Sequence, residues 1–313
     1  MQALVLEAKN ILTLQEVSPP EPRADELLIE VKLCSIGGSE YMALANPGIR
    51  PLPHIMGHGI SGTAPQAKRV AVYPLRGCGD CNYCQEGLTQ LCDDWALIGV
   101  QLDGGFAQQV AIPEANLVDL PGSLSWEQSA FIEPFANAVN AWELAQIDPK
   151  NTVAIIGAGG LGLGLVALAS ETGCDITVSD LSETRRSVAS QLGATYTTAK
   201  PQGHFDVVFE TFGSVESRRR ALEITKRGGK CIFMGFATAS LDVNISNIIR
   251  HQKHLMGSFV YSLEQFRKAV NLAESCLAEW VTNLSFNEVE PVLNAYLKGD
   301  FSIAKAALRP NRT

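Results

Sequence analysis

The stretch NTVAIIGAGGLGLGLVALASETG, residues 151–173, decides how the second half of this 313-residue chain folds. It begins with a short, continuous apolar run, the pattern of a strand buried on both faces of a parallel sheet. A glycine-rich turn follows, and then a long apolar segment typical of a helix. A second strand, DITVSD (175–180), comes next. Strand, helix and strand in this order predict a βαβ unit.

The same alternation continues toward the C-terminus. Residues 182–193 indicate a helix, 205–211 a strand, 214–229 a helix and 230–235 a strand. Short apolar strands that alternate with helices predict a parallel sheet covered by helices on both faces. The sequence therefore predicts an α/β domain that begins at about residue 135.

The glycines of the βαβ unit have the spacing of a dinucleotide-binding loop. They form G-x-G-x-x-G directly after the first strand, and an aspartate ends the second strand. The first glycine permits a tight turn, the second lets backbone approach a pyrophosphate, and the third lets helix pack on strand. The aspartate would accept hydrogen bonds from the ribose hydroxyls and repel a 2′-phosphate. We therefore expect NAD(H), bound by Gly157, Gly159, Gly160, Leu161, Gly162 and Asp180.

Two alternatives remain open at this loop. Glycines also serve plain turns, although here the strand, the helix, the second strand and the terminal acid all fall in register. Arg185 and Arg186 follow closely behind Asp180. They indicate either some tolerance for NADP(H) or a solvated helix face.

The first third of the chain has a different pattern. Residues 1–8, 11–17 and 26–33 alternate apolar and polar side chains, and Pro/Gly-rich segments separate them. Period 2 with frequent breaks predicts a compact antiparallel β domain. Near the C-terminus, two helical patterns at about 263–279 and 286–299 precede a last short strand, IAKAALRP (303–310).

Composition and charge exclude several kinds of partner. The net charge is −8 and no block of Lys and Arg occurs, which argues against nucleic acid and anionic membranes as partners. No window has the roughly 18 uninterrupted apolar residues of a membrane span, and the N-terminus lacks a signal-peptide pattern. We therefore expect a cytoplasmic protein. In that compartment the eight cysteines are thiols or metal ligands rather than disulfides.

Four of these cysteines form a compact cluster. In GCGDCNYCQEGLTQLC (77–92) the spacing is C-x2-C-x2-C-x7-C. Four thiolates can close a tetrahedral zinc site, which leaves no position for water and so serves to fold its lobe. An iron–sulfur cluster and unrelated buried cysteines are the alternatives. We expect structural zinc at Cys78, Cys81, Cys84 and Cys92, and core positions for Cys34, Cys174, Cys231 and Cys276.

A β domain, a four-cysteine lobe and a dinucleotide-binding domain in this order resemble the medium-chain dehydrogenase/reductase superfamily. The segments 103–121, 129–145 and 205–214 agree with its zinc-containing alcohol and polyol dehydrogenase branch. The resemblance implies a GroES-like catalytic domain, 1–134 and 258–313, with its zinc lobe at about 76–94. A Rossmann NAD-binding domain, 135–257, would be inserted between the two parts, with the active site in the cleft. Family members form homodimers or homotetramers.

The resemblance also implies a catalytic zinc, and here the chain departs from the pattern. The branch usually carries C-G-[ST]-D, with the cysteine as a zinc ligand, but Gly37 stands at that cysteine position. Ser39 and Glu40 fall on the Ser/Thr and the Asp. The usual G-H-E is Gly57-His58-Gly59, which keeps the histidine ligand and loses the acid. Glu133, in E-P-F, is the other recognised ligand.

Two ligands are fewer than the three that catalytic zinc normally has. Glu40 could supply the third, and so could Cys34. Without zinc, Ser39, Tyr41 and His58 are candidate hydrogen-bond donors to the substrate oxygen. Ser39 could instead be a turn residue, and His58 a satisfied buried histidine.

We therefore expect an NAD(H)-dependent oxidoreductase that interconverts an alcohol and an aldehyde or ketone, with its catalytic zinc altered or absent. The expected catalytic residues are Ser39, Glu40, His58 and Glu133. One alternative is a zinc-free reductase of activated carbonyls or enones, and another is a non-catalytic NAD-binding protein. Polyol dehydrogenases often have an arginine where Val260 stands. Its absence favours a more apolar alcohol or ketone over a polyol.

Overall fold

The computed structural model describes residues 1–241 and 243–311 and divides the chain into two compact units. The β-rich unit comprises Met1–Glu133 and Ser262–Thr313, and the α/β unit comprises Pro134–Tyr261. These boundaries differ from the expected ones by at most four residues. In the described part of the chain, no helix is long and apolar enough to cross a membrane.

A parallel sheet forms the centre of the α/β unit, as expected, and it has six strands. Its order is β13-β12-β11-β14-β15-β16, with β11 in the middle of the sheet. The strands are β11 (Thr152–Ile156), β12 (Asp175–Ser179), β13 (Tyr196–Thr198), β14 (Phe205–Glu210), β15 (Thr225–Phe233) and β16 (His254–Gly257). The order runs in opposite directions from β11 toward β13 and from β14 toward β16. Because such crossovers are right-handed, their helices cover opposite faces of the sheet.

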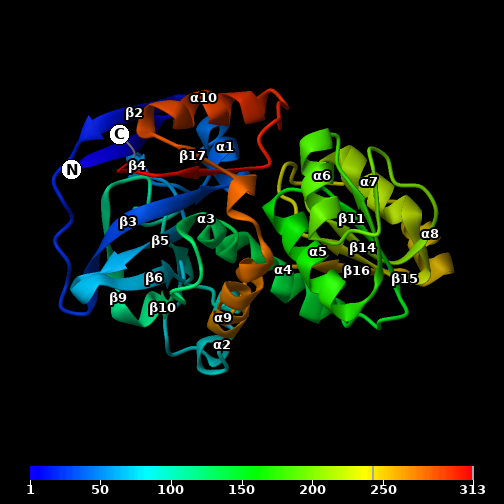
Figure 1. Cartoon of the computed structure of the whole chain (residues 1–313). Helices are drawn as coiled ribbons and strands as arrows, with labels where there is room; N and C mark the ends of the chain where they lie inside the picture. Colours follow the sequence, from blue (N-terminus) through cyan, green and yellow to red (C-terminus); the bar gives the residue numbers. More distant parts are fainter. Residues whose placement is uncertain (242, 312–313) are drawn as a thin grey trace. The chain divides into compact units, whose positions relative to one another are not determined.

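Helices connect these strands (Figure 1). Helix α5 joins β11 to β12 and packs against α6, which joins β12 to β13. Helix α7 packs on β14 and β15. The helices are α4 (Ile132–Ala145), α5 (Gly160–Thr172), α6 (Glu183–Leu192), α7 (Val215–Ile224) and α8 (Ile245–His251).

The long strand β3 organises the β-rich unit. It pairs antiparallel with β5, β9 and β18, so that strands from both ends of the chain meet on it. Both termini lie in this unit (Figure 1). The strands of its larger sheet are β3 (Glu26–Ile36), β5 (Gly59–Ala64), β6 (Lys68–Val72), β9 (Gln109–Pro113), β10 (Leu117–Asp119), β17 (Val281–Leu284) and β18 (Lys305–Leu308).

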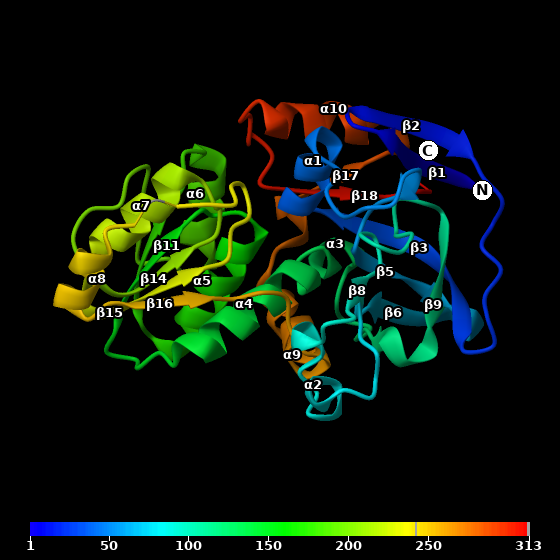
Figure 2. The same ribbon diagram turned by 180° about the vertical axis from the view of Figure 1, so that it is seen from behind.

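Smaller elements complete the β-rich unit. A three-stranded sheet joins β1 (Gln2–Ala8), β2 (Ile11–Glu16) and β4 (His54–Ile55), and a two-stranded one joins β7 (Leu75–Arg76) and β8 (Ala96–Leu97). Helix α1 packs against α10, as Figure 2 shows from behind. The helices are α1 (Gly38–Ala45), α2 (Asn82–Gln85), α3 (Trp126–Ser129), α9 (Leu263–Leu272) and α10 (Phe286–Leu297).

Two helices end earlier than the sequence pattern predicted. Helix α9 stops at Leu272, and only short 3-10 turns continue to Trp280. Helix α7 stops at Ile224, because Thr225 begins β15. Thr225 is β-branched and its hydroxyl donates to the carbonyl of Ala221, which competes with the helical hydrogen bonds.

Candidate active site

Three ionisable side chains that are distant in the sequence meet in the β-rich unit. His58 Nδ1 lies 2.6 Å from Glu40 Oε1, and His58 Nε2 lies 3.5 Å from Glu133 Oε2. The imidazole is thus held between two carboxylates. Glu40 is fully buried, whereas His58 and Glu133 are 15% and 14% exposed. The site therefore has a buried carboxylate behind the ring and an accessible side at Glu133.

Local structure explains why Glu40 is buried here. β3 ends at Ile36, and α1 begins one residue after Gly37. Glu40 is in the first turn of α1, and its Oε2 accepts a hydrogen bond from the Gly37 N–H at 2.9 Å. A carboxylate is favourable at a helix N-terminus because it faces unpaired N–H groups and the positive end of the helix dipole. The second oxygen is left to face His58.

The two partners change each other's protonation. Burial alone would raise the pKa of Glu40, but the charge and hydrogen bond of His58, with a smaller contribution from Arg50, lower it to about 2. Burial alone would lower the pKa of His58, but the charges of Glu40 and Glu133 raise it to about 10. Near neutral pH the structure therefore holds an imidazolium between two carboxylates.

The donors present do not make up a three-ligand zinc site. His58 Nε2 and Glu133 Oε2 face each other, but Gly37 and Gly59 have no side chain to add a third donor. Both carboxylate oxygens of Glu40 are already engaged, one by His58 and the other by the Gly37 N–H. Glu40 acts here as a partner of the histidine, a role that ligand-orienting carboxylates often have.

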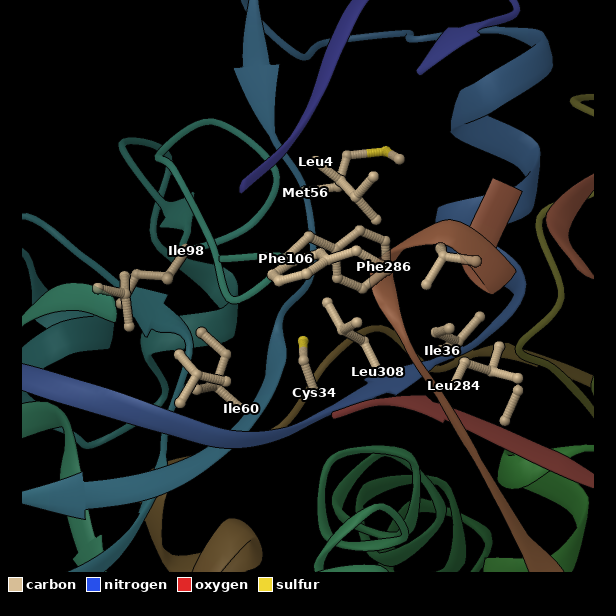
Figure 3. Close-up of a cluster of buried hydrophobic side chains, with 14 of the residues drawn as sticks. Leu4, Cys34, Ile36, Met56, Ile60, Ile98, Phe106, Leu284, Phe286 and Leu308 are labelled. Atoms are coloured by element: carbon tan, nitrogen blue, oxygen red, sulfur yellow. The ribbon is translucent and has the colours of Figure 1, made fainter. Parts of the chain in front are cut away.

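Cys34 is also unsuited as the missing ligand, as its expected core position implies. The side chain is fully buried in the apolar cluster of the β-rich unit, among Ile60, Phe106 and Leu308 (Figure 3). A Cβ built on Gly57 would lie 2.7 Å from its sulfur, so protein closely surrounds the thiol. Burial raises the pKa of this thiol well above its usual value, which disfavours the metal-binding thiolate.

Ser39 is partly buried at the start of α1, and its environment contains a residue that the sequence reading missed. Arg50 Nη2 donates to Ser39 Oγ at 2.7 Å. Arg50 lies in the proline-rich segment between α1 and β4, which reads as an ordinary turn. Tyr41, also considered as a donor, has its ring against Tyr296 and Phe301, so it packs α1 onto the C-terminal part of the unit.

A second missed residue is Lys305, which comes from the far end of the chain. It is only 4% exposed, and its Nζ donates to Ser35 Oγ at 2.6 Å and to the Ile36 carbonyl at 3.1 Å. Ser35 also packs against Gly59, where an added Cβ would lie 2.6 Å from Ser35 Cβ. Position 59 therefore has no room for an acid unless Ser35 moves. The only signal in the sequence was a single lysine in an apolar strand.

The four cysteines of the lobe do come together. Their sulfurs all lie within 4.8 Å of one another, with Cys78 Sγ 3.6 Å from Cys92 Sγ and 4.0 Å from Cys84 Sγ. Tetrahedral zinc with bonds of about 2.3 Å places its sulfurs roughly 3.8 Å apart. Backbone N–H groups of Cys78, Cys81 and Cys84 each point at a neighbouring sulfur at 3.4 Å. This donor set fits a closed zinc site.

The glycine loop of the α/β unit has the geometry that its spacing predicted. Gly157 has φ +100°, which favours glycine, and a Cβ on Gly162 would lie 1.9 Å from the Gly157 carbonyl oxygen. Gly159 caps α5, whose first residues are Gly160 and Leu161. A Cβ on Gly159 would meet only Arg185 Nη1, at 3.8 Å. The space before α5 therefore suits a diphosphate, which the free N–H groups of the helix can bind.

Asp180 directly follows β12 and lies beside this loop. Its Oδ2 accepts from the Ala158 N–H and its Oδ1 from the Ser182 N–H, both at 2.8 Å. Each oxygen keeps a further lone pair for a ligand. Arg186 is directed to the backbone, where it donates to the Asp180 carbonyl at 2.7 Å. Arg185, in contrast, lies against the glycine loop.

Two family models match parts of both units. The family model for the alcohol dehydrogenase GroES-like domain matches residues 23–122, and that for zinc-binding dehydrogenase matches 160–275. Sorbitol dehydrogenase of Bacillus subtilis is 29% identical over 100% of this chain and 98% of its own length. L-galactonate-5-dehydrogenase of Escherichia coli is 28% identical over 87% of each chain.

A solved thermostable alcohol dehydrogenase of Pyrobaculum aerophilum is 25% identical, with a TM-score of 0.89 over 99% of each chain. The expected GroES-like and Rossmann folds are thereby confirmed. The chain belongs to the medium-chain dehydrogenase/reductase superfamily, in its zinc-containing alcohol and polyol dehydrogenase branch, and it is an oxidoreductase.

Proposed function

We propose that the protein interconverts an alcohol and an aldehyde or ketone by hydride transfer with NAD(H), without a three-ligand catalytic zinc. The observation that carries this proposal is His58, which is held between Glu40 and Glu133. Ser39 directly precedes Glu40 in α1. In oxidation, a hydride leaves the carbinol carbon for the nicotinamide ring and a proton leaves the hydroxyl oxygen. In reduction, both return.

The α/β unit supports NAD(H) as the coenzyme, which supplies or accepts the hydride. The loop before α5 binds the diphosphate through backbone N–H groups, and the helix dipole favours its negative charge. Asp180 accepts hydrogen bonds from the ribose hydroxyls, and its charge disfavours a 2′-phosphate.

The β-rich unit handles the substrate oxygen. Negative charge grows on this oxygen as hydride reaches a carbonyl, so fixed donors and positive charge stabilise the transition state. The Ser39 hydroxyl hydrogen-bonds to this oxygen. In oxidation it takes the proton of the substrate hydroxyl and releases its own proton to solvent, and in reduction both transfers run in reverse. The His58 imidazolium offsets one of the two carboxylate charges that flank it. Glu40 is a positioning residue, which fixes the ring and keeps it protonated, and Glu133 holds the other ring nitrogen.

Zinc has a structural role in this proposal. Cys78, Cys81, Cys84 and Cys92 bind one ion that fixes the lobe, whose exposed residues supply little apolar core of their own. The names of the relatives support a small hydroxylated substrate, such as sorbitol or L-galactonate. That differs from the more apolar substrate that Val260 favours, so an assay must include both kinds.

The test is NADH oxidation with a panel of aldehydes, ketones, quinones and enones, before and after a chelator, with zinc per chain measured on the same samples. Saturable turnover of an aldehyde or ketone that survives chelation supports the proposal. If the chelator removes one of two zinc ions per chain and turnover is lost with it, the proposal of an active site without catalytic zinc is contradicted. Turnover of quinones and enones alone would identify the protein as a reductase of activated carbonyls. Glycine at positions 37 and 59, in place of zinc ligands, also favours that function. NADH binding without any turnover assigns a non-catalytic binding protein.

A further inference from the structure

Arg50 places a cation beside Ser39, the residue that contacts the substrate oxygen in the proposed function. Its Nη2 donates to Ser39 Oγ at 2.7 Å, a good hydrogen bond. Its Nη1 reaches the Pro47 carbonyl oxygen only at 3.5 Å, which is a weak contact. The side chain is partly buried, so the guanidinium has lost part of its hydration while it remains within reach of a ligand.

The hydrogen-bonding capacity of Arg50 is largely unused. A guanidinium has five N–H groups, and the two contacts above engage one each. Nε is buried and has no acceptor, and no carboxylate oxygen lies within 4 Å of the Arg50 nitrogen atoms among residues 1–241 and 243–311. A partly buried cation whose donors are unmet by the protein is stabilised by an anion with several acceptor oxygens.

A purely structural role as counter-ion to Glu40 does not account for these contacts. Glu40 already has His58 at 2.6 Å and the Gly37 N–H at 2.9 Å. Arg50 contributes only a longer-range charge to that carboxylate. Its direct hydrogen bond goes to the hydroxyl of Ser39 instead.

We propose that Arg50 binds an anionic group of the substrate, a carboxylate or a phosphate, so that the substrate is an anionic alcohol or the carbonyl compound made from it. The planar guanidinium presents paired N–H groups that match the oxygens of either group. This inference rests on the proposed function, because it takes Ser39 as the residue beside the reacting oxygen. It also replaces the apolar substrate that the sequence pattern favoured.

The experiment compares substrates that differ in one end group. Sorbitol, gluconate and sorbitol 6-phosphate share a six-carbon chain and end in a hydroxyl, a carboxylate or a phosphate. Butan-2-ol and 3-hydroxybutyrate form a smaller pair. We expect kcat/KM with NAD⁺ to be roughly 10- to 100-fold higher for an anionic member than for its neutral counterpart, the size of a charge-assisted hydrogen-bond pair.

Variants assign the preference to Arg50. Arg50→Gln should raise KM for the anionic substrate by a similar roughly 10- to 100-fold. The lost hydrogen bond to Ser39 affects both kinds of substrate, so the anionic-to-neutral ratio of kcat/KM is the quantity that should fall. Arg50→Lys, which keeps the charge but loses the planar fork, should recover part of the effect. Arg23→Gln is the matched control. Arg23 is exposed and lies before β3, whereas Ser39 lies after β3. The eleven residues of this strand span roughly 35 Å, so Arg23 is remote from Ser39.

Calorimetry separates this inference from the proposed function. Gluconate and sorbitol 6-phosphate are titrated into the wild-type and Arg50→Gln proteins with NADH bound, where no turnover is needed. Binding to the wild type that the variant loses supports Arg50 as an anion site even if no substrate is turned over. Equal affinity of both proteins, or equal kcat/KM for neutral and anionic substrates, overturns the inference and leaves the oxidoreductase activity standing. The ratio of gluconate to sorbitol 6-phosphate affinity identifies carboxylate or phosphate as the preferred group.

Discussion

The cysteine lobe and the His58 site lie in the same unit, and the family uses zinc at both positions, but only the lobe has kept a full donor set. The lobe brings four sulfurs within 4.8 Å of one another. The His58 site brings together one nitrogen and one accessible carboxylate, with glycine at the two other positions of the family pattern. Both sites are ordered by their own hydrogen bonds, so the difference lies in chemistry rather than in loss of structure.

Charge explains how the His58 site tolerates the difference. A thiolate at position 37 and a carboxylate at position 59 would each carry one negative charge, and glycine removes both. Those two charges equal the charge of a zinc ion, so the loss of all three leaves the summed charge of the remaining groups unchanged. The imidazolium of His58 then faces Glu40 and Glu133.

The largest effect is expected when the complete site is broken. Cys92→Ser removes a buried ligand from the lobe, and zinc coordination is coupled to folding by on the order of 10 kcal/mol. We expect zinc content to fall to zero and the midpoint of thermal unfolding to drop sharply. Cys174→Ala, outside the lobe, is the control and should cost about 1 kcal/mol with the zinc retained. Unchanged zinc content and stability in Cys92→Ser would contradict a structural zinc site at the four cysteines.

His58→Gln tests whether the incomplete site is still catalytic. The variant keeps a hydrogen-bonding group but loses the positive charge, and we expect kcat to fall roughly 100- to 1,000-fold. Steady-state kinetics and NADH titration measure turnover and coenzyme affinity separately, and the affinity should not change. His204→Gln, at an exposed histidine of the α/β unit, serves as the control. Turnover that survives in His58→Gln would mean that His58 is only a satisfied buried histidine.

Restoring a ligand should turn the incomplete site into a zinc site. Gly37 has an extended backbone that any residue can adopt, and a Cβ there would meet Glu40 Oε2 at an ordinary 3.5 Å. Gly37→Cys adds a thiolate to His58 and Glu133, so we expect zinc content to rise from about one to about two per chain. Gly37→Ala should leave it at about one. A zinc content that stays at one in Gly37→Cys would show that His58 and Glu133 are not poised as ligands.

The smallest effect is the pH dependence of the ion pair. Glu40 has a lowered pKa of about 2, so its contribution to stability is lost as pH falls from 4.5 through 2. His58 has a raised pKa of about 10, so its contribution is complete below pH 6.5 and is lost as pH rises through 10. The free energy of unfolding of the wild type should therefore exceed that of His58→Gln most between pH 4.5 and 6.5. Urea unfolding at about pH 5.5 and about pH 9 measures this difference. A difference that grows toward the higher pH contradicts the paired imidazolium.

The sequence predicted best what depends on local spacing. The cysteine cluster lies within Gly77–Cys92, and the glycine loop with Asp180 lies within one βαβ unit, so both could be recognised from the residues themselves. The meeting of Glu40, His58 and Glu133 was predictable only through the family resemblance, because three separate elements supply them. Arg50 and Lys305 were missed. Their partners Ser39 and Ser35 are found only once the path of a turn and the pairing of β18 with β3 are known.

Zinc content per chain, measured by elemental analysis on protein purified without added metal, tests the central claim most directly. The account predicts one zinc, which Cys92→Ser abolishes and His58→Gln leaves in place. Two zinc ions per chain, one of them lost in His58→Gln, would contradict it and would make His58 and Glu133 metal ligands.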